Sequence, residues 1–259
     1  MTETMDLEGF DGTRIHVTGM GEGPVLLLLH GLFSSAETNW LRYGTAQRIA
    51  DAGFRLLMPD FRGHGRSESP MDEAAWPEDV LSMDVEALLP QLGLDPEGGD
   101  FVLGGYSLGA RTSARLLARG LRPRAVILAG MGLEGLTDAN RRTGWFVRMI
   151  EGRGQWPLGS GEFLAETFMK ASVSQPDAML WLLERQLDTP DSRLRSFDLP
   201  ALVVAGADDH DNGSAPDLAA LLPQGQYREI PGNHMMSVTK KELGAEMLAF
   251  LRRTAAPAR

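Results

Sequence analysis

Short apolar runs without alternation are the feature that most restricts how this chain can fold. Such runs occur at residues 25–29, 54–58, 101–103, 125–129 and 201–205. A strand that is apolar at successive positions is buried on both faces, as strands of parallel sheets are. The segments between these runs have helical spacing, most clearly residues 81–92. Buried strands that alternate with amphipathic helices predict an α/β fold, with a mostly parallel central sheet and helices on both of its faces.

This alternation stops between Gly130 and Asp198, where helical patterns appear but no strand-like run. We therefore predict one core domain, built from residues 1–130 and 199–259, with a short helical insertion at residues 131–198 that we call the cap segment. Its aromatic residues include Trp145, Phe146, Trp156, Phe163, Phe168 and Trp181, and we expect most of them to form the segment's own core. Residues 12–18 alternate polar and apolar side chains, which predicts an early strand with one exposed face.

The composition restricts the partners of the protein. The formal net charge of -10 would repel the phosphates of nucleic acid and of anionic membranes. The chain contains no cysteine, which excludes disulfides and thiolate chemistry. Residues 1–12 carry acidic but no basic side chains, the opposite of a secretory leader. We expect a cytoplasmic protein with a small-molecule substrate and without nucleic acid or membrane as a partner. We also expect a frayed tail at residues 252–259. No oligomeric state follows from the sequence.

The most specific chemical signal is the sequence Gly-Tyr-Ser-Leu-Gly at residues 105–109. It follows the run at 101–103 and precedes a helix-like segment, which is the context of a nucleophile elbow. A serine in this turn has a strained backbone, and side chains two residues before and after it would collide unless they are glycine. The turn places the hydroxyl at a helix N-terminus, where free N–H groups favour developing negative charge. Ser107 is therefore the predicted nucleophile, and the N–H of Leu108 is one predicted oxyanion donor.

A second oxyanion donor must come from another loop at the carboxyl edge of the sheet. The run at 25–29 ends in His30-Gly31-Leu32-Phe33, and Gly31 permits a sharp exit that would aim the N–H of Leu32 at the same oxygen. The N–H of Phe33 is the alternative donor. We interpret His30 as structural, a side chain that hydrogen-bonds the loop.

The base follows by elimination. In a fold with this elbow the catalytic groups occur in the order serine, acid, histidine, and only His210 and His234 follow Ser107. His234 comes after a further predicted strand at residues 226–230, whereas His210 adjoins the acid candidates and could hardly be oriented by them. His234 is therefore the predicted base. The loop after the run at 201–205 supplies the candidates for the acid that holds its imidazole: Asp208, Asp209 and Asp211.

Over nearly its full length the chain resembles the α/β-hydrolase superfamily. Besides the elbow, the resemblance rests on His30-Gly31, on Asp-Phe-Arg-Gly-His-Gly-Arg-Ser at residues 60–67, on Gly206-x-x-Asp209 and on Gly232-x-His234. It implies that the acid lies three residues after the glycine, which selects Asp209. It also implies that Asp60 and His64 shape a loop.

The resemblance separates this chain from some branches of the superfamily. Epoxide hydrolases and haloalkane dehalogenases of this fold carry aspartate where this chain has Ser107, which argues against an alkyl-enzyme mechanism. The glycine-rich HGGG oxyanion loop of one lipase and esterase group has no counterpart here. We therefore expect a serine hydrolase in which Ser107, Asp209 and His234 cleave a small, apolar ester or related acyl bond through an acyl-enzyme, with Leu32 and Leu108 as oxyanion donors.

Two other functions would use the same features. A carbon–carbon bond hydrolase or a cofactor-free perhydrolase would need the same three side chains, and a non-enzymatic ligand-binding protein could retain the fold. No cofactor is expected for any of them. The chain has no HExxH or paired-histidine spacing that would bind a metal and no nucleotide-binding loop.

Overall fold

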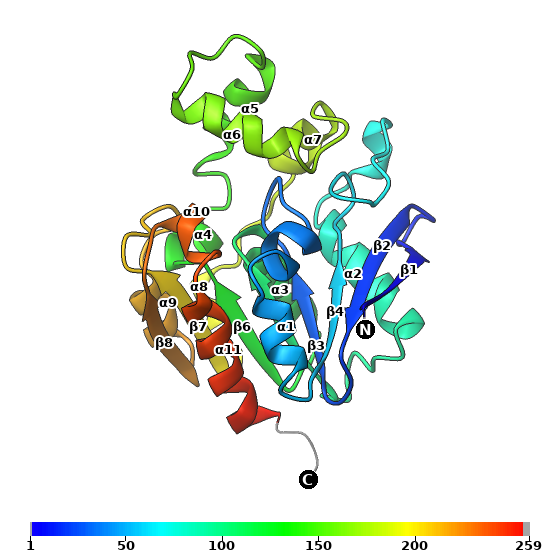
Figure 1. Cartoon of the computed structure of the whole chain (residues 1–259), viewed down its shortest axis with the longest axis vertical. Coiled ribbons are helices and arrows are strands. Elements are labelled where there is room, and N and C mark those ends of the chain that lie inside the picture. Colours follow the sequence, from blue (N-terminus) through cyan, green and yellow to red (C-terminus); the bar gives the residue numbers. More distant parts are fainter. Residues whose placement is uncertain (1, 256–259) are drawn as a thin grey trace.

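The computed structural model describes residues 2–255, which are organised around an eight-stranded sheet (Figure 1). The strands are, in chain order, β1 (Thr2–Glu8), β2 (Arg14–Met20), β3 (Val25–Leu29), β4 (Arg55–Pro59), β5 (Phe101–Tyr106), β6 (Ala125–Ala129), β7 (Ala201–Gly206) and β8 (Gly225–Ile230). Their order across the sheet is β1-β2-β4-β3-β5-β6-β7-β8. The pairs β1–β2 and β2–β4 are antiparallel and the other neighbours are parallel. The predicted mostly parallel α/β sheet is confirmed.

Helices and single turns connect the strands. They are the π-helical turn η1 (Glu37–Leu41), α1 (Thr45–Ala50), the 3-10 turn η2 (Glu73–Ala75), α2 (Val80–Gln91), α3 (Leu108–Arg119), α4 (Leu133–Thr137), α5 (Thr143–Glu151), α6 (Gly161–Lys170), α7 (Ala178–Glu184), α8 (Asp191–Leu194), α9 (Ala215–Leu221), α10 (His234–Ser237) and α11 (Lys241–Thr254).

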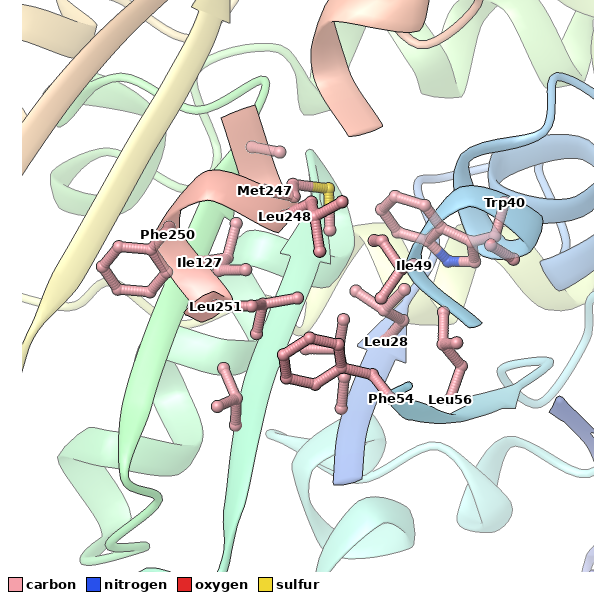
Figure 2. Close-up of a cluster of buried hydrophobic side chains, with 14 of the residues drawn as sticks. Leu28, Trp40, Ile49, Phe54, Leu56, Ile127, Met247, Leu248, Phe250 and Leu251 are labelled. Carbon is pink, nitrogen blue, oxygen red and sulfur yellow. The ribbon is translucent and has the colours of Figure 1, made fainter. Parts of the chain in front are cut away.

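Strand β3 shows why its sequence does not alternate. Leu26 and Leu28 pack into a cluster with side chains of α1 and α11, part of which is drawn in Figure 2. Leu27 and Leu29 point to the opposite face and pack into a second cluster with side chains of α2. All four leucines are fully buried, so helices cover both faces of the sheet, as predicted. The central strands thereby form a rigid frame from whose ends the site loops emerge.

The first strand pair differs from the sequence prediction. The exposed face expected for residues 12–18 is wrong, since every residue of β2 from Ile15 to Met20 is buried. His16 is buried although it is polar. Its backbone N–H donates to the Ser67 hydroxyl (2.9 Å), and its ring Nδ1 lies 2.8 Å from the Asp6 carboxylate of β1. Strand β1, whose residues are mostly exposed, was not predicted, and it covers the edge that β2 would otherwise present to solvent.

Between β6 and β7 the described chain contains helices α4 to α8 and no strand. Figure 1 shows α5, α6 and α7 stacked together at one end of the molecule, beyond the sheet. The buried residues here are mostly aliphatic or methionine, among them Met149, Ile150, Met169, Met179, Leu182 and Leu183.

The aromatic residues of the cap segment form less of its core than expected. None of the six is fully buried, although Phe146, Phe168 and Trp181 pack partly against the neighbouring apolar cluster. Trp145, Phe146 and Phe168 line a cavity. The methionine and leucine side chains already fill the interior, so the rings lie at its boundary.

The C-terminal helix includes part of the predicted frayed tail. Helix α11 continues to Thr254 and includes Arg252 and Arg253, so the predicted frayed tail is wrong for these residues, and its last part, 256–259, lies outside the described residues. Within residues 2–255, no helix has both the length and the apolar character needed to cross a bilayer.

Candidate active site

Ser107 occupies the turn between β5 and α3. Its backbone has φ 53° and ψ -111°, a strained conformation for a residue with a side chain. The turn is held because the Ser107 N–H donates to the Ala129 carbonyl of β6 at 2.8 Å. A Cβ on Gly105 would lie 2.1 Å from the carbonyl carbon of Gly109, so the two glycines permit a contact that larger residues would prevent. The sequence G-x-S-x-G thus forms the elbow that its spacing requires.

The loops that follow β7 and β8 touch each other at two glycines. A Cβ on Gly206 would lie only 2.0 Å from the carbonyl oxygen of Gly232. The backbone N–H groups of Ala207 and Asp208 donate to the carbonyls of Ile230 (2.8 Å) and Gly232 (3.1 Å), which ties the loops together. This contact brings the residues that follow each glycine to one place at the edge of the sheet.

His234 lies between Ser107 and Asp209. Its Nε2 is 3.0 Å from the Ser107 hydroxyl, and its Nδ1 is 2.9 Å from Oδ2 of Asp209. The side chains of His234 and Asp209 are only 12% and 3% exposed, so water competes little for these hydrogen bonds. A carboxylate at Nδ1 favours the tautomer that carries its proton there, which leaves Nε2 free to accept the serine proton.

The other acid and base candidates lie apart from this arrangement. Asp208 and His210 are exposed. The Asp211 carboxylate forms an ion pair with Arg142 at 2.9 Å, and its N–H donates to Oδ1 of Asp209 at 3.2 Å. The geometry therefore separates Asp209 from Asp208, which the residues alone left open.

The loop after β3 approaches Ser107 from the other side. A Cβ on Gly31 would lie 3.6 Å from Cβ of Ser107. The Gly31 N–H donates to the Asn39 side chain at 2.9 Å, which holds the loop in place. Leu32, Phe33 and Leu108 all line the cavity beside the serine, and within residues 2–255 their backbone N–H groups have no protein acceptor. These N–H groups are therefore free to donate to a bound oxyanion.

His30 stabilises the same loop from within the core. Its Nδ1–H donates to the Gly31 carbonyl at 2.7 Å, and its Nε2 accepts from the Phe61 N–H at 2.9 Å. Complete burial lowers the pKa of His30 to about 4, so the ring is neutral. Asp60 accepts backbone N–H groups from Ala36 (2.7 Å) and Arg66 (2.9 Å). Both side chains have structural contacts, as expected from the sequence.

Tyr106 is a site residue that the sequence did not reveal. Its hydroxyl donates to the carbonyl of His234 at 2.5 Å and lies 2.9 Å from the Ser237 hydroxyl. Burial raises the pKa of this phenol, so it remains a donor at neutral pH. The residue before Ser107 thus holds the short helix α10, which begins with His234. No motif marks this role, because the position is variable in G-x-S-x-G.

A cavity of about 540 Å³ lies beside Ser107 and His234. Apolar side chains form much of its wall, among them Phe33, Trp145, Phe146, Leu164 and Phe168. Arg111, Arg142, Gln186 and Asn212 add a polar part. Within the described part of the chain, no group of three or more acidic or histidine side chains is placed to hold a metal ion.

Comparison with known proteins supports the fold. The sequence profile of the alpha/beta hydrolase family matches residues 26–243. A non-heme haloperoxidase from Rhodococcus erythropolis is 25% identical over 93% of this chain and 97% of its own length. An epoxide hydrolase from Caballeronia sordidicola is 37% identical over 100 residues, which cover 39% of this chain. The chain spans between 14% and 28% of the length of the epoxide hydrolases it matches.

Solved structures share the whole architecture. The structure of an esterase from Exiguobacterium antarcticum superposes with a TM-score of 0.76 over 96% of this chain and 99% of the esterase. The two sequences are only 17% identical, so the likeness concerns the fold alone.

Proposed function

The chain belongs to the alpha/beta hydrolase family, and from this premise we propose that it is a serine hydrolase that cleaves a small ester or a related acyl bond. One observation carries the proposal, namely the hydrogen-bonded series from the Ser107 hydroxyl through His234 to Asp209 at the edge of a largely apolar cavity. A hydroxyl, an imidazole and a carboxylate in this order are the groups that acyl transfer requires.

In the proposed reaction, Ser107 Oγ attacks the carbonyl carbon of the substrate while His234 Nε2 accepts its proton. Asp209 stabilises the resulting imidazolium, and the N–H groups of Leu32 and Leu108 donate to the oxyanion. His234 then protonates the leaving alcohol, which departs and leaves an acyl-enzyme. A water molecule activated by His234 attacks this ester, and the acid product leaves as Ser107 recovers its proton.

The epoxide hydrolase relatives suggest a different chemistry that Ser107 does not support. Opening an epoxide through a carboxylate nucleophile produces an alkyl ester of the enzyme, which water can hydrolyse at the carboxyl carbon. Attack by a serine hydroxyl would produce an ether, which has no carbonyl carbon for water to attack. The residue at the elbow therefore favours acyl transfer.

The test is labelling with a fluorophosphonate probe together with hydrolysis of 4-nitrophenyl esters of graded acyl length. We expect labelling at Ser107, turnover of short apolar esters, and a loss of at least roughly 10³-fold in kcat/KM for Ser107→Ala. Ser113→Ala is the matched control, because Ser113 is a buried serine on α3 whose hydroxyl donates to the Gly109 carbonyl at 2.8 Å. Folded protein that neither takes the label nor hydrolyses any ester would overturn the proposal.

Perhydrolysis is a second candidate, favoured by the similarity to a haloperoxidase over most of the chain. Hydrogen peroxide would replace water in the attack on the acyl-enzyme and release a peracid, which would oxidise a halide ion. Peroxide-dependent bromination in acetate buffer measures this activity. Bromination that depends on Ser107 and is faster than hydrolysis of every ester in the panel would select perhydrolysis over ester cleavage.

A further inference from the structure

The polar part of the cavity contains a guanidinium group without a carboxylate partner. Arg111 lies on α3 one turn after the nucleophile, where its N–H donates to the Ser107 carbonyl at 2.9 Å, and its side chain lines the cavity. Nε donates to the Gly135 carbonyl and Nη1 to the Ala139 carbonyl, each at 3.0 Å, and Nη1 also donates to the Gln186 side chain. Among the described residues, Nη2 has no acceptor.

Neighbouring arginines are neutralised, which makes Arg111 different. Arg115 and Arg119, further along α3, form ion pairs with Asp79 and Glu86. Arg142, which lines the same cavity, pairs with Asp211 at 2.9 Å. No carboxylate of residues 2–255 forms an ion pair with Arg111.

The environment of Arg111 fixes its orientation without cancelling its charge. Neutral carbonyls and an amide hold the Nε and Nη1 side of the group. Burial lowers the pKa of Arg111 to about 10, which still leaves it protonated at neutral pH. Asp188 and Asp138 act on this charge through space and raise the pKa of Arg111, but neither forms an ion pair with it. A half-buried cation without a paired carboxylate is costly, and an anionic ligand would reduce that cost. The group is therefore oriented for an anion that the protein itself does not supply.

We propose that Arg111 binds a carboxylate of the substrate, so that the enzyme acts on esters with an apolar body and one acidic group. This inference rests on the proposed function and narrows its substrate class. A monoanion matches the single unpaired cation, whereas a phosphate dianion would place excess negative charge beside Asp211. The rings of Trp145, Phe146 and Phe168 contact the apolar body.

The position of Arg111 sets the length of substrate to test. Four residues of helix separate its backbone from that of Ser107, a rise of roughly 6 Å. Half-esters of succinate, glutarate and adipate, with 4-nitrophenol as the leaving group, place a carboxylate at increasing distances from the ester carbonyl. The methyl ester of each half-ester is the neutral partner with the same acyl chain. A carboxylate on the leaving group is tested with 4-carboxyphenyl acetate and its methyl ester.

The measured quantity is the ratio of kcat/KM for the acidic ester to that for its neutral partner. We expect this ratio to exceed about 10 for one member of the series and to fall by about 10- to 100-fold in Arg111→Gln. Arg119→Gln is the matched control: it removes the same charge from the same helix at a residue outside the cavity, and its ratio should match that of the wild type. A wild-type ratio at or below 1 throughout the series overturns the inference.

A binding measurement separates the inference from the proposed function. Calorimetry of Ser107→Ala with monomethyl glutarate, which carries a single carboxylate, should show binding that is lost in Ser107→Ala/Arg111→Gln. Arg111-dependent binding without any ester turnover would support the anion site and refute the hydrolase. Ester turnover without a preference for acidic esters would support the hydrolase and refute the anion site. If Arg111→Gln does not fold, Arg111→Lys, which keeps the charge but loses the planar donors, should give an intermediate ratio; a ratio equal to that of the wild type would count against the site.

Discussion

Replacing Gly206 by alanine should impair the active site without changing any of its reacting side chains. The new Cβ would lie 2.0 Å from the Gly232 carbonyl oxygen, whereas unbonded carbon and oxygen atoms stay roughly 3.3 Å apart. The two loops must therefore separate by about 1.3 Å. These loops carry Asp209 and His234, whose hydrogen bond is 2.9 Å long. The same separation would lengthen it to about 4 Å, which no longer is a hydrogen bond.

The expected loss follows from this displacement. A misplacement of about 1 Å in a catalytic group can cost roughly 100-fold in rate, so we expect kcat of Gly206→Ala to fall about 100-fold. KM should change little, because Gly206 does not line the cavity. The forced contact should also lower the free energy of unfolding by about 1–3 kcal/mol. For a chain of this size each kcal/mol lowers Tm by about 2–4 °C.

The assay combines ester hydrolysis, the rate of fluorophosphonate labelling and thermal unfolding. Labelling is informative because it needs His234 to activate Ser107 but no leaving alcohol. Gly144→Ala is the control. Apart from its chain neighbours and the backbone of its own helix, no atom lies within 4 Å of the new Cβ, and residue 144 lies within α5, where alanine is favoured. It should leave kcat unchanged. A folded Gly206→Ala variant with kcat within about threefold of the wild type would refute the reasoning, since the 100-fold loss follows from the displacement.

Three further predictions concern the acid, its support and the buried histidines. Asp209→Asn should lower kcat by at least about 10³-fold, since an amide cannot hold the same tautomer of His234. Asp208→Asn should change kcat less than about twofold, because the Asp208 side chain is exposed. A larger loss in Asp208→Asn than in Asp209→Asn would assign the acid to Asp208. Tyr106→Phe removes the 2.5 Å hydrogen bond to the His234 carbonyl. It should lower the free energy of unfolding by about 1–2 kcal/mol and reduce kcat several-fold. An unchanged Tm and kcat would show that this hydrogen bond contributes to neither stability nor catalysis. Burial lowers the pKa of His30 to about 4 and of His64 to about 3. Below pH 6.5 both histidines are therefore protonated in the unfolded chain while they are still neutral in the native protein. Stability should therefore fall from pH 6.5 to 4, by up to about 3 kcal/mol for His30, and urea unfolding that shows constant stability over this range contradicts the prediction.

The elements that local pattern specifies could be predicted from the sequence. The run at residues 125–129 corresponds to β6, and the glycines around Ser107 indicated the elbow, because burial on both faces and a strained turn restrict which residues can stand at each position. Where the pattern was weak, as in β1, or where a neighbour covered a polar residue, as with His16, the prediction failed. These failures share a cause, since the burial of a strand depends on which elements pack against it.

The assembly of the site depended on contacts between segments distant in the chain. The spacing of Asp208 and Asp209 from β7 differs by one residue, so the spacing alone left both open. The contact of Gly206 with Gly232 brings the two loops together, and the hydrogen bond to His234 is made by Asp209. The contacts of Tyr106 and Arg111 also involve partners more than twenty residues away in the chain. Tyr106 contacts His234, and Arg111 contacts Gly135, Ala139 and Gln186. The sequence by itself therefore determined which residues could react, because chemistry belongs to the residue type and its local turn. Which of them meet, and which charge stays unpaired, was decided by the packing of β7, β8 and the cap segment around the elbow.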